Sequence, residues 1–175
     1  IIASFQSGAI SYLYYAERVY QINLALAGIA VGTVSLPALS KTIKSKNFFK
    51  ASDIQNKSIQ LSLLLSIPAS LGLILASKEI VNGLFGYGSF TSNDVEITSR
   101  ALSFFGYGIV AFALIKILSN FFFARDNTKI PFYISILIVF LNIFISISFF
   151  NQIGFLIIPI ATSISSWIGV FLFLF

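Results

Sequence analysis

Long apolar stretches separated by short polar ones dominate the sequence. A membrane-spanning helix needs about 20 apolar residues, and five stretches reach or approach that length: residues 9–39, 58–77, 101–124, 130–150 and 154–175. Residues 1–5 resemble the end of an earlier span. The pattern therefore predicts an all-α, polytopic transmembrane helix bundle over residues 1–175, a single transmembrane region of about five full spans plus the end of one more.

The charges between these stretches predict their orientation. Residues 40–57 carry five lysines against one aspartate, whereas residues 78–100 carry two basic and three acidic side chains. Basic loops stay on the cytoplasmic side of a membrane, so we expect the first segment inside and the second outside. Residues 125–129, with two basic and one acidic side chain, should lie inside again, and the uncharged residues 151–153 outside.

Composition supports a membrane protein and narrows its chemistry. The chain is 57% hydrophobic and only 10% charged, and it contains no Cys and no His. Disulfides and thiolate metal sites are excluded, and the usual general base is absent, so we do not expect an enzyme. The net charge of +5 lies mostly in short loops, which argues against nucleic acid as a partner. Because both ends are apolar and no Met occurs, we expect an internal part of a longer chain.

Glu17 and Arg18 are the only charged residues in the first stretch. An ionised group in hydrocarbon is costly unless it is paired or hydrated. A guanidinium there can bind a phosphate or diphosphate; the alternative is a boundary residue that reaches out to the interface. Adjacent helical residues point about 100° apart, so we expect Glu17 to find its partner on another helix, with Lys116 as the candidate. Lys116 could also be a boundary residue.

Helical spacing predicts one stripe along the first helix. It is polar at one end and small at the other, and it comprises Ser11, Tyr14, Arg18, Gln21, Ala25, Gly28, Gly32 and Ser35. Gly28 and Gly32 form a small-xxx-small face that allows close helix contact. Pro37 predicts a helix end, and Pro68 predicts a kink in the next span.

A second group of polar residues lies in the last two stretches. Asn142 and Ser146 are four residues apart on one helix, and Thr162 lies within the next. Oxygen ligands on adjacent helices suit a hard cation such as Na⁺. Hydrogen bonding between the helices is the alternative explanation.

Three parts of the sequence together are similar to one family. They are residues 11–18 continuing into 28–40, residues 84–91 with 101–102 and 116–131, and residues 161–167. These segments resemble the MurJ/MviN lipid II flippases of the multidrug/oligosaccharidyl-lipid/polysaccharide exporter superfamily. The resemblance runs over nearly the whole chain in the family's order.

The resemblance implies a MATE-like fold in which this chain forms most of the second of two lobes. It implies alternating access, with lipid II, the undecaprenyl-diphosphate-linked peptidoglycan precursor, moved from the cytoplasmic to the periplasmic leaflet of the bacterial inner membrane. Membrane lipids and cell-wall synthesis proteins are the further partners it allows. The Gly28/Gly32 face and the Pro68 kink would let the helices rock against one another.

The resemblance also implies residue roles. Arg18 occupies the position of a cavity arginine that binds the lipid diphosphate, and Glu17 stands where relatives often have Asp; we group Lys116 with them. Asn142 and Thr162 match two ligand positions of sodium-coupled members, whereas Ser146 departs from the acidic residue found there. Either a Na⁺ gradient or the membrane potential could bias the motion, and no cofactor is expected.

Two alternatives remain open at this point. Another exporter of the superfamily, handling a polysaccharide-linked lipid or a drug, would share the fold. A membrane scaffold that transports nothing would share the hydropathy.

Overall fold

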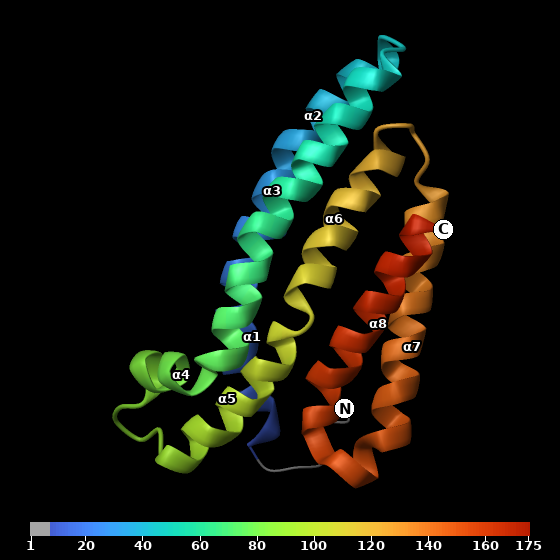
Figure 1. The fold of residues 1–175 in the computed structure, drawn as a ribbon. Coiled ribbons are helices and arrows are strands. Elements are labelled where there is room, and N and C mark those ends of the chain that lie inside the picture. The colour runs from blue at the N-terminus through green and yellow to red at the C-terminus, as the bar shows by residue number, and fades with distance from the viewer. Residues whose placement is uncertain (1–7) are drawn as a thin grey trace.

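A computed structural model describes residues 8–175, and every element in that range is helical (Figure 1). The elements are α1 (Ala9–Leu24), the π-helix η2 (Ala25–Ala30), α2 (Val31–Lys44), α3 (Phe48–Leu75), α4 (Ser77–Phe85), α5 (Ser92–Gly106), α6 (Ile109–Phe123), α7 (Lys129–Ile153), the 3₁₀ turn η3 (Gly154–Leu156) and α8 (Ile157–Leu174). The predicted all-α bundle is confirmed. The predicted end of an earlier span, residues 1–5, lies outside the described residues.

Four helical stretches in residues 8–175 are long and apolar enough to cross a membrane. They are Ala9–Lys44, Phe48–Leu75, Ser92–Phe123 and Lys129–Leu174. The last contains two antiparallel helices, α7 and α8, because the chain reverses at Gly154, whose φ of 72° suits glycine (Figure 1). Each of the five predicted spans overlaps one of these stretches, and the last two predicted spans share Lys129–Leu174.

The basic segment 40–57 is mostly helical, so its interpretation as a loop was wrong. Only residues 45–47 separate α2 from α3, and Asn47 caps α3 by accepting a hydrogen bond from the Lys50 backbone N–H at 3.0 Å. Lysine, glutamine and alanine favour helix, so a basic segment can extend a span instead of ending it. The helix end predicted at Pro37 was also wrong, because Pro37 lies inside α2.

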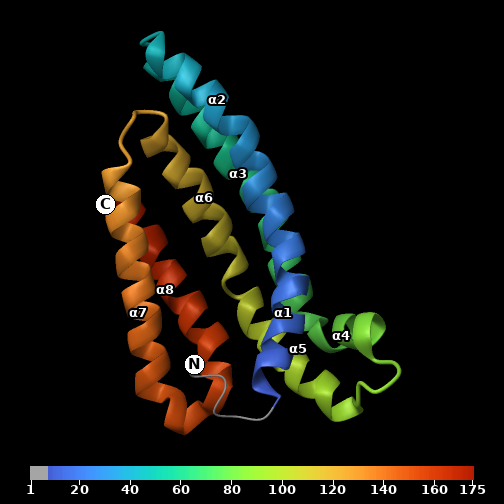
Figure 2. The same cartoon turned by 180° about the vertical axis from the view of Figure 1, so that it is seen from behind.

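The helix α6 lies at the centre of the bundle. α2 and α3 pack on one side of it and α8 on the other, with α7 beyond α8 (Figures 1 and 2). Ile109, Ala113 and Ile117 of α6 are fully buried. In α7, by contrast, only Pro131 and Ser146 are buried. The bundle therefore has a packed centre and one outer helix with few buried residues.

The connections lie at the two ends of the bundle. The α2–α3 and α6–α7 turns lie at one end, whereas α4 and the α7–α8 reversal lie at the other (Figure 1). A capping box begins α5, in which Asp94 N–H donates to Thr91 Oγ1 and Thr91 N–H donates to Asp94 Oδ2.

Candidate functional site

Arg18 lies on an exposed face of α1, within a short chain of polar contacts. Its guanidinium carbon is 4.6 Å from the centre of the Tyr14 ring, and its Nη1 donates to Gln21 Oε1 at 3.4 Å. Gln21 Nε2 in turn donates to Glu17 Oε1 at 2.9 Å. These partners are three or four residues apart, the spacing at which helical side chains meet. Local contacts on α1 alone therefore hold the guanidinium.

Within residues 8–175, neither Arg18 nor Lys116 makes an ion pair. The expected pairing of Glu17 with Lys116 was wrong, since Glu17 binds Gln21 instead. Distance explains this: Lys116 packs beside Gly32, where a Cβ would lie 3.3 Å from Lys116 Cγ. Gly32 is 14 residues beyond Arg18, roughly 21 Å along a helix at about 1.5 Å per residue. Both cations are exposed and uncompensated, but they lie at different levels of the bundle.

The predicted stripe does not stay on one face. Tyr14 and Arg18 at its polar end are exposed, whereas Gly28, Gly32 and Ser35 at its small end are buried. The cause is η2, the π-helix at Ala25–Ala30, which holds more residues per turn than an α-helix and so rotates the residues after it. A stripe drawn with regular α-helical spacing cannot take this into account.

The buried half of the stripe packs closely against α6. A Cβ on Gly28 would lie 3.2 Å from Ala113 Cα, and one on Gly32 would lie 3.2 Å from Asn120 Nδ2. Glycine is the residue that allows such an approach between membrane helices. Pro68, the third predicted packing or hinge residue, lies on the exposed side of α3, and the helix continues through it to Leu75.

Side chains from neighbouring helices bond the backbone at and after the π-helix. Ser62 Oγ on α3 donates to the Ala27 carbonyl at 2.8 Å. Asn120 Nδ2 on α6 donates to the Gly32 carbonyl at 2.7 Å and lies 3.3 Å from Ser35 Oγ. In hydrocarbon an irregular backbone is tolerated only when such partners satisfy it.

A second interruption separates α5 from α6 at residues 107–108 and has the same kind of support. Ser70 of α3 donates to the Gly106 carbonyl at 2.8 Å. Ser163 and Trp167 of α8 donate to the carbonyls of Phe104 and Tyr107 at 2.7 Å and 3.0 Å. Sequence reasoning missed this role of α3 and α8.

A signal for it was present in the sequence. Serines recur every fourth residue on α3, at Ser58, Ser62, Ser66 and Ser70, and all four are buried. Such spacing places small hydroxyl side chains on one helix face, which in a membrane marks contact with other helices.

The structure brings two of the three predicted cation ligands together. Asn142 Nδ2 donates to Thr162 Oγ1 at 2.8 Å between α7 and α8, and Thr162 Oγ1 donates to the Ile158 carbonyl at 2.7 Å. Ser146 lies one turn from Asn142 and is buried, and its Oγ has no hydrogen-bond partner within the described chain. Three neutral side-chain oxygens thus lie on the α7–α8 pair.

Comparison with known proteins gives consistent results. The family model described as lipid II flippase MurJ matches residues 1–175. A probable lipid II flippase MurJ of Rickettsia prowazekii is 39% identical over 95% of this chain and 33% of its own length, and one of Rhizobium tropici is 39% identical over 96% and 32%. The chain therefore spans about a third of the length of these curated relatives.

A solved structure agrees with the sequence comparisons. It is described as lipid II flippase MurJ in an inward closed conformation. The match has a TM-score of 0.89 at 33% identity and covers 97% of this chain and 36% of that one.

Proposed function

Since this chain belongs to the lipid II flippase MurJ family, we propose that the full-length protein containing it moves lipid II from the cytoplasmic to the periplasmic leaflet of the bacterial inner membrane by alternating access. The chain supplies several apolar helices of a multi-pass membrane protein. Lipid II carries a diphosphate on an undecaprenyl tail, so its transport needs a cationic contact for the headgroup beside an apolar surface for the tail.

The observation that carries the proposal is the uncompensated guanidinium of Arg18. Among the residues described, Arg18 has Gln21 and the Tyr14 ring as its contacts and no carboxylate. A charge on a membrane helix is costly unless something compensates it. A diphosphate provides that compensation through bidentate, charge-assisted hydrogen bonds. Lys116, on α6, would contact the headgroup at a different depth of the bundle from Arg18.

Helix motion in this proposal centres on the π-helix. Kinks in long helices occur at π-bulges, and η2, which contains Gly28, lies between the segment that carries Arg18 and the contact of Gly32 with α6. Bending there would move Arg18 relative to Gly32 while the close α2–α6 contact stays intact. Pro68 would give α3 a matching point of flexibility.

The test is replacement of Arg18 in the full-length protein while the native flippase is depleted. We expect Arg18→Ala to abolish growth and Arg18→Lys to restore part of it, because an ammonium keeps the charge but loses the bidentate geometry. Arg100→Ala is the matched control, since Arg100 is exposed and pairs with Glu96 at 3.2 Å. Normal growth of Arg18→Ala, with the protein present at the normal level, would refute the assigned role.

Coupling to a cation gradient or to the membrane potential would drive the cycle. Asn142, Ser146 and Thr162 offer neutral oxygens that suit Na⁺, and the unpartnered, buried Ser146 Oγ is the observation that favours a ligand there. If the side-chain amide of Asn142 flips, its oxygen replaces its nitrogen beside Thr162. The gradient would supply the energy for reorientation.

A stability assay tests this part without transport. Ligand binding to the folded state raises Tm as the ligand concentration rises. We expect NaCl to raise the Tm of the full-length protein above its value in equal KCl, and Asn142→Leu to abolish the difference. Equal Tm in both salts would leave the membrane potential as the driving force and would not affect the Arg18 assignment.

A further inference from the structure

An apolar groove lies between α2 and α3, on the hairpin that carries the basic segment. Its volume is about 590 Å³. On the η2–α2 side it is lined at four-residue spacing by Leu26, Ala30, Val34 and Ala38, so one continuous helix face forms this wall. Leu61 and Leu65 line the α3 side.

The polar residues in the groove do not offer free hydroxyls to a ligand. Ser35 Oγ donates to the Gly32 carbonyl at 3.2 Å, and Ser58 Oγ donates to the Ile54 carbonyl at 2.8 Å. Because both donors are used within their own helices, the groove presents an apolar surface along its length. Lys57, near one end, is the only charged residue that lines it.

The groove is about as long as one leaflet of a membrane is deep. From Leu26 to Ala38 the helix rises roughly 18 Å at about 1.5 Å per residue. The hydrocarbon half of a bilayer is about 15 Å thick. A single acyl chain lying in the groove would therefore be covered for most of its length.

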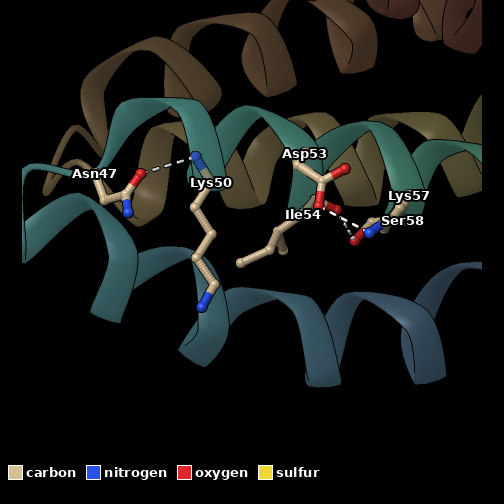
Figure 3. A network of polar contacts seen from close by, with 6 residues as sticks. All are labelled: Asn47, Lys50, Asp53, Ile54, Lys57 and Ser58. Atoms are coloured by element: carbon tan, nitrogen blue, oxygen red, sulfur yellow. Dashed lines mark hydrogen bonds and ion pairs between the residues drawn. The ribbon is translucent and has the colours of Figure 1, made fainter.

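Two further lysines, Lys41 and Lys50, continue the lining faces beyond the groove's end. Lys41 lies seven residues after Val34, and Lys50 lies seven residues before Lys57, so each shares a helix face with a groove residue. Figure 3 shows the Lys50 side chain reaching toward α2, while Lys57 pairs with Asp53 at 2.8 Å. Asp53 is the only acidic residue in segment 40–57, so this end of the groove remains strongly positive.

Two aromatic side chains mark the same end as interfacial. Phe48 and Phe49 begin α3 directly after the turn, and both are exposed. Exposed aromatic rings beside lysines are typical of the headgroup level of a bilayer. The charge, the depth and the aromatic residues all fit a lipid whose head lies at the lysines and whose tail lies in the groove.

We propose that this groove binds one acyl chain of an anionic phospholipid of the cytoplasmic leaflet, with the headgroup phosphate held by Lys41, Lys50 and Lys57. The site is separate from the Arg18 face, and it does not depend on the proposed transport function. A protein partner fits less well, because a protein segment would not need a groove of leaflet depth with cations at one end only.

Native mass spectrometry of the full-length protein tests the assignment. The protein in detergent is titrated with phosphatidylglycerol and with phosphatidylcholine of the same acyl chains. We expect tighter binding of phosphatidylglycerol, and the triple variant Lys41→Gln, Lys50→Gln, Lys57→Gln should weaken that binding roughly tenfold or more, since each lysine near an anionic surface contributes about fivefold. Lys129→Gln, which removes a lysine outside the hairpin, should leave it unchanged.

A second pair of variants tests the groove without altering charge. Val34→Trp fills the groove and should weaken phosphatidylglycerol binding several-fold. Leu75→Trp is its control, because Leu75 lies outside the groove and is similarly exposed, 79% against 76% for Val34. Equal affinity for the two phospholipids, or no loss in the triple variant, would overturn the proposal. Displacement of phosphatidylglycerol by an equimolar undecaprenyl diphosphate would also overturn it, by assigning the groove to the transported lipid.

Discussion

The centre of the bundle and its outermost helix are both strongly apolar, but the first is buried and the second is exposed. In the most apolar part of Ser92–Phe123, which contains α6, 61% of the residues are buried, against 11% in that of Lys129–Leu174, which contains α7. Yet the α7–α8 stretch is the more hydrophobic of the two. Hydrophobicity therefore does not identify the packed helix here.

The reason is that lipid tails are as apolar as a protein core. Burying Leu or Phe against another helix gains little over leaving it in lipid, so close packing and hydrogen bonds select the interface. The central helices accordingly use Gly28 against Ala113, and Ser62 and Asn120 on backbone carbonyls. α7 shows large exposed side chains such as Phe140 and Phe144, and its Asn142 donates a hydrogen bond to Thr162 of α8.

The strongest test of this difference is to replace one isoleucine by alanine in each region. Ile117 of α6 is fully buried, whereas Ile136 of α7 is 51% exposed. We expect Ile117→Ala to lower the free energy of unfolding by about 2–5 kcal/mol, because a buried cavity replaces close contacts. Ile136→Ala should change it by no more than about 0.5 kcal/mol.

Denaturation of the full-length protein by SDS, followed by circular dichroism, measures both changes. A large loss for Ile136→Ala would show that another part of the full-length protein covers this face of α7. The contrast between centre and outer helix would then hold only within this chain.

A smaller effect on the free energy of unfolding is expected when leucine replaces either of two helical glycines. Gly28→Leu must displace the Ala113 backbone, so we expect a loss of about 1–3 kcal/mol from overpacking. A Cβ at Gly72 on α3 would meet nothing within 4 Å. Gly72→Leu should therefore be neutral or stabilising by up to about 1 kcal/mol, since it removes the flexibility of glycine from a helix.

The same unfolding measurement compares the two glycine variants. Equal losses at Gly28 and Gly72 would mean that replacing helical glycine is costly everywhere in this chain. The close approach of η2 to α6 would then not depend on Gly28.

The sequence predicts well what depends on long apolar runs and capping residues. The all-α fold and the α5 start at Thr91 follow from such local signals. The prediction fails where the backbone leaves the regular α-helix. Nothing in Ala25–Ala30 requires a π-turn, which forms in a tertiary setting where Ser62 satisfies the Ala27 carbonyl.

The candidate site shows the same limit. Arg18 stands out in the sequence because a charge in an apolar run is rare, and its contact with Gln21 follows from regular helical spacing. The burial of the stripe's second half, by contrast, depends on η2. The charge of segment 40–57 predicts its side of the membrane, but it does not reveal that all of its lysines except Lys46 lie on two helices that line or continue a groove.

The smallest predicted difference in stability is between variants of two asparagines. It tests whether hydrogen bonds, like packing, are more important in the centre than in α7. Asn120 is 3% exposed and donates to the Gly32 carbonyl after the π-helix, whereas Asn142 is partly exposed and donates to a Thr162 hydroxyl that also bonds its own helix. We expect Asn120→Leu to cost about 1–2 kcal/mol because a buried carbonyl loses its side-chain donor.

Asn142→Leu should cost only about 0.6 kcal/mol, the typical value for a side-chain hydrogen bond between membrane helices. Both variants are measured by SDS unfolding without Na⁺, so that cation binding at Asn142 does not contribute. Asn120→Asp tests whether the lost donor or the changed shape causes the loss in Asn120→Leu. An aspartate has a shape similar to asparagine but cannot donate when it is ionised. If Asn142→Leu cost more than Asn120→Leu, α7 would be fixed by polar contacts more strongly than the centre, and the distinction between the two regions would rest on packing alone.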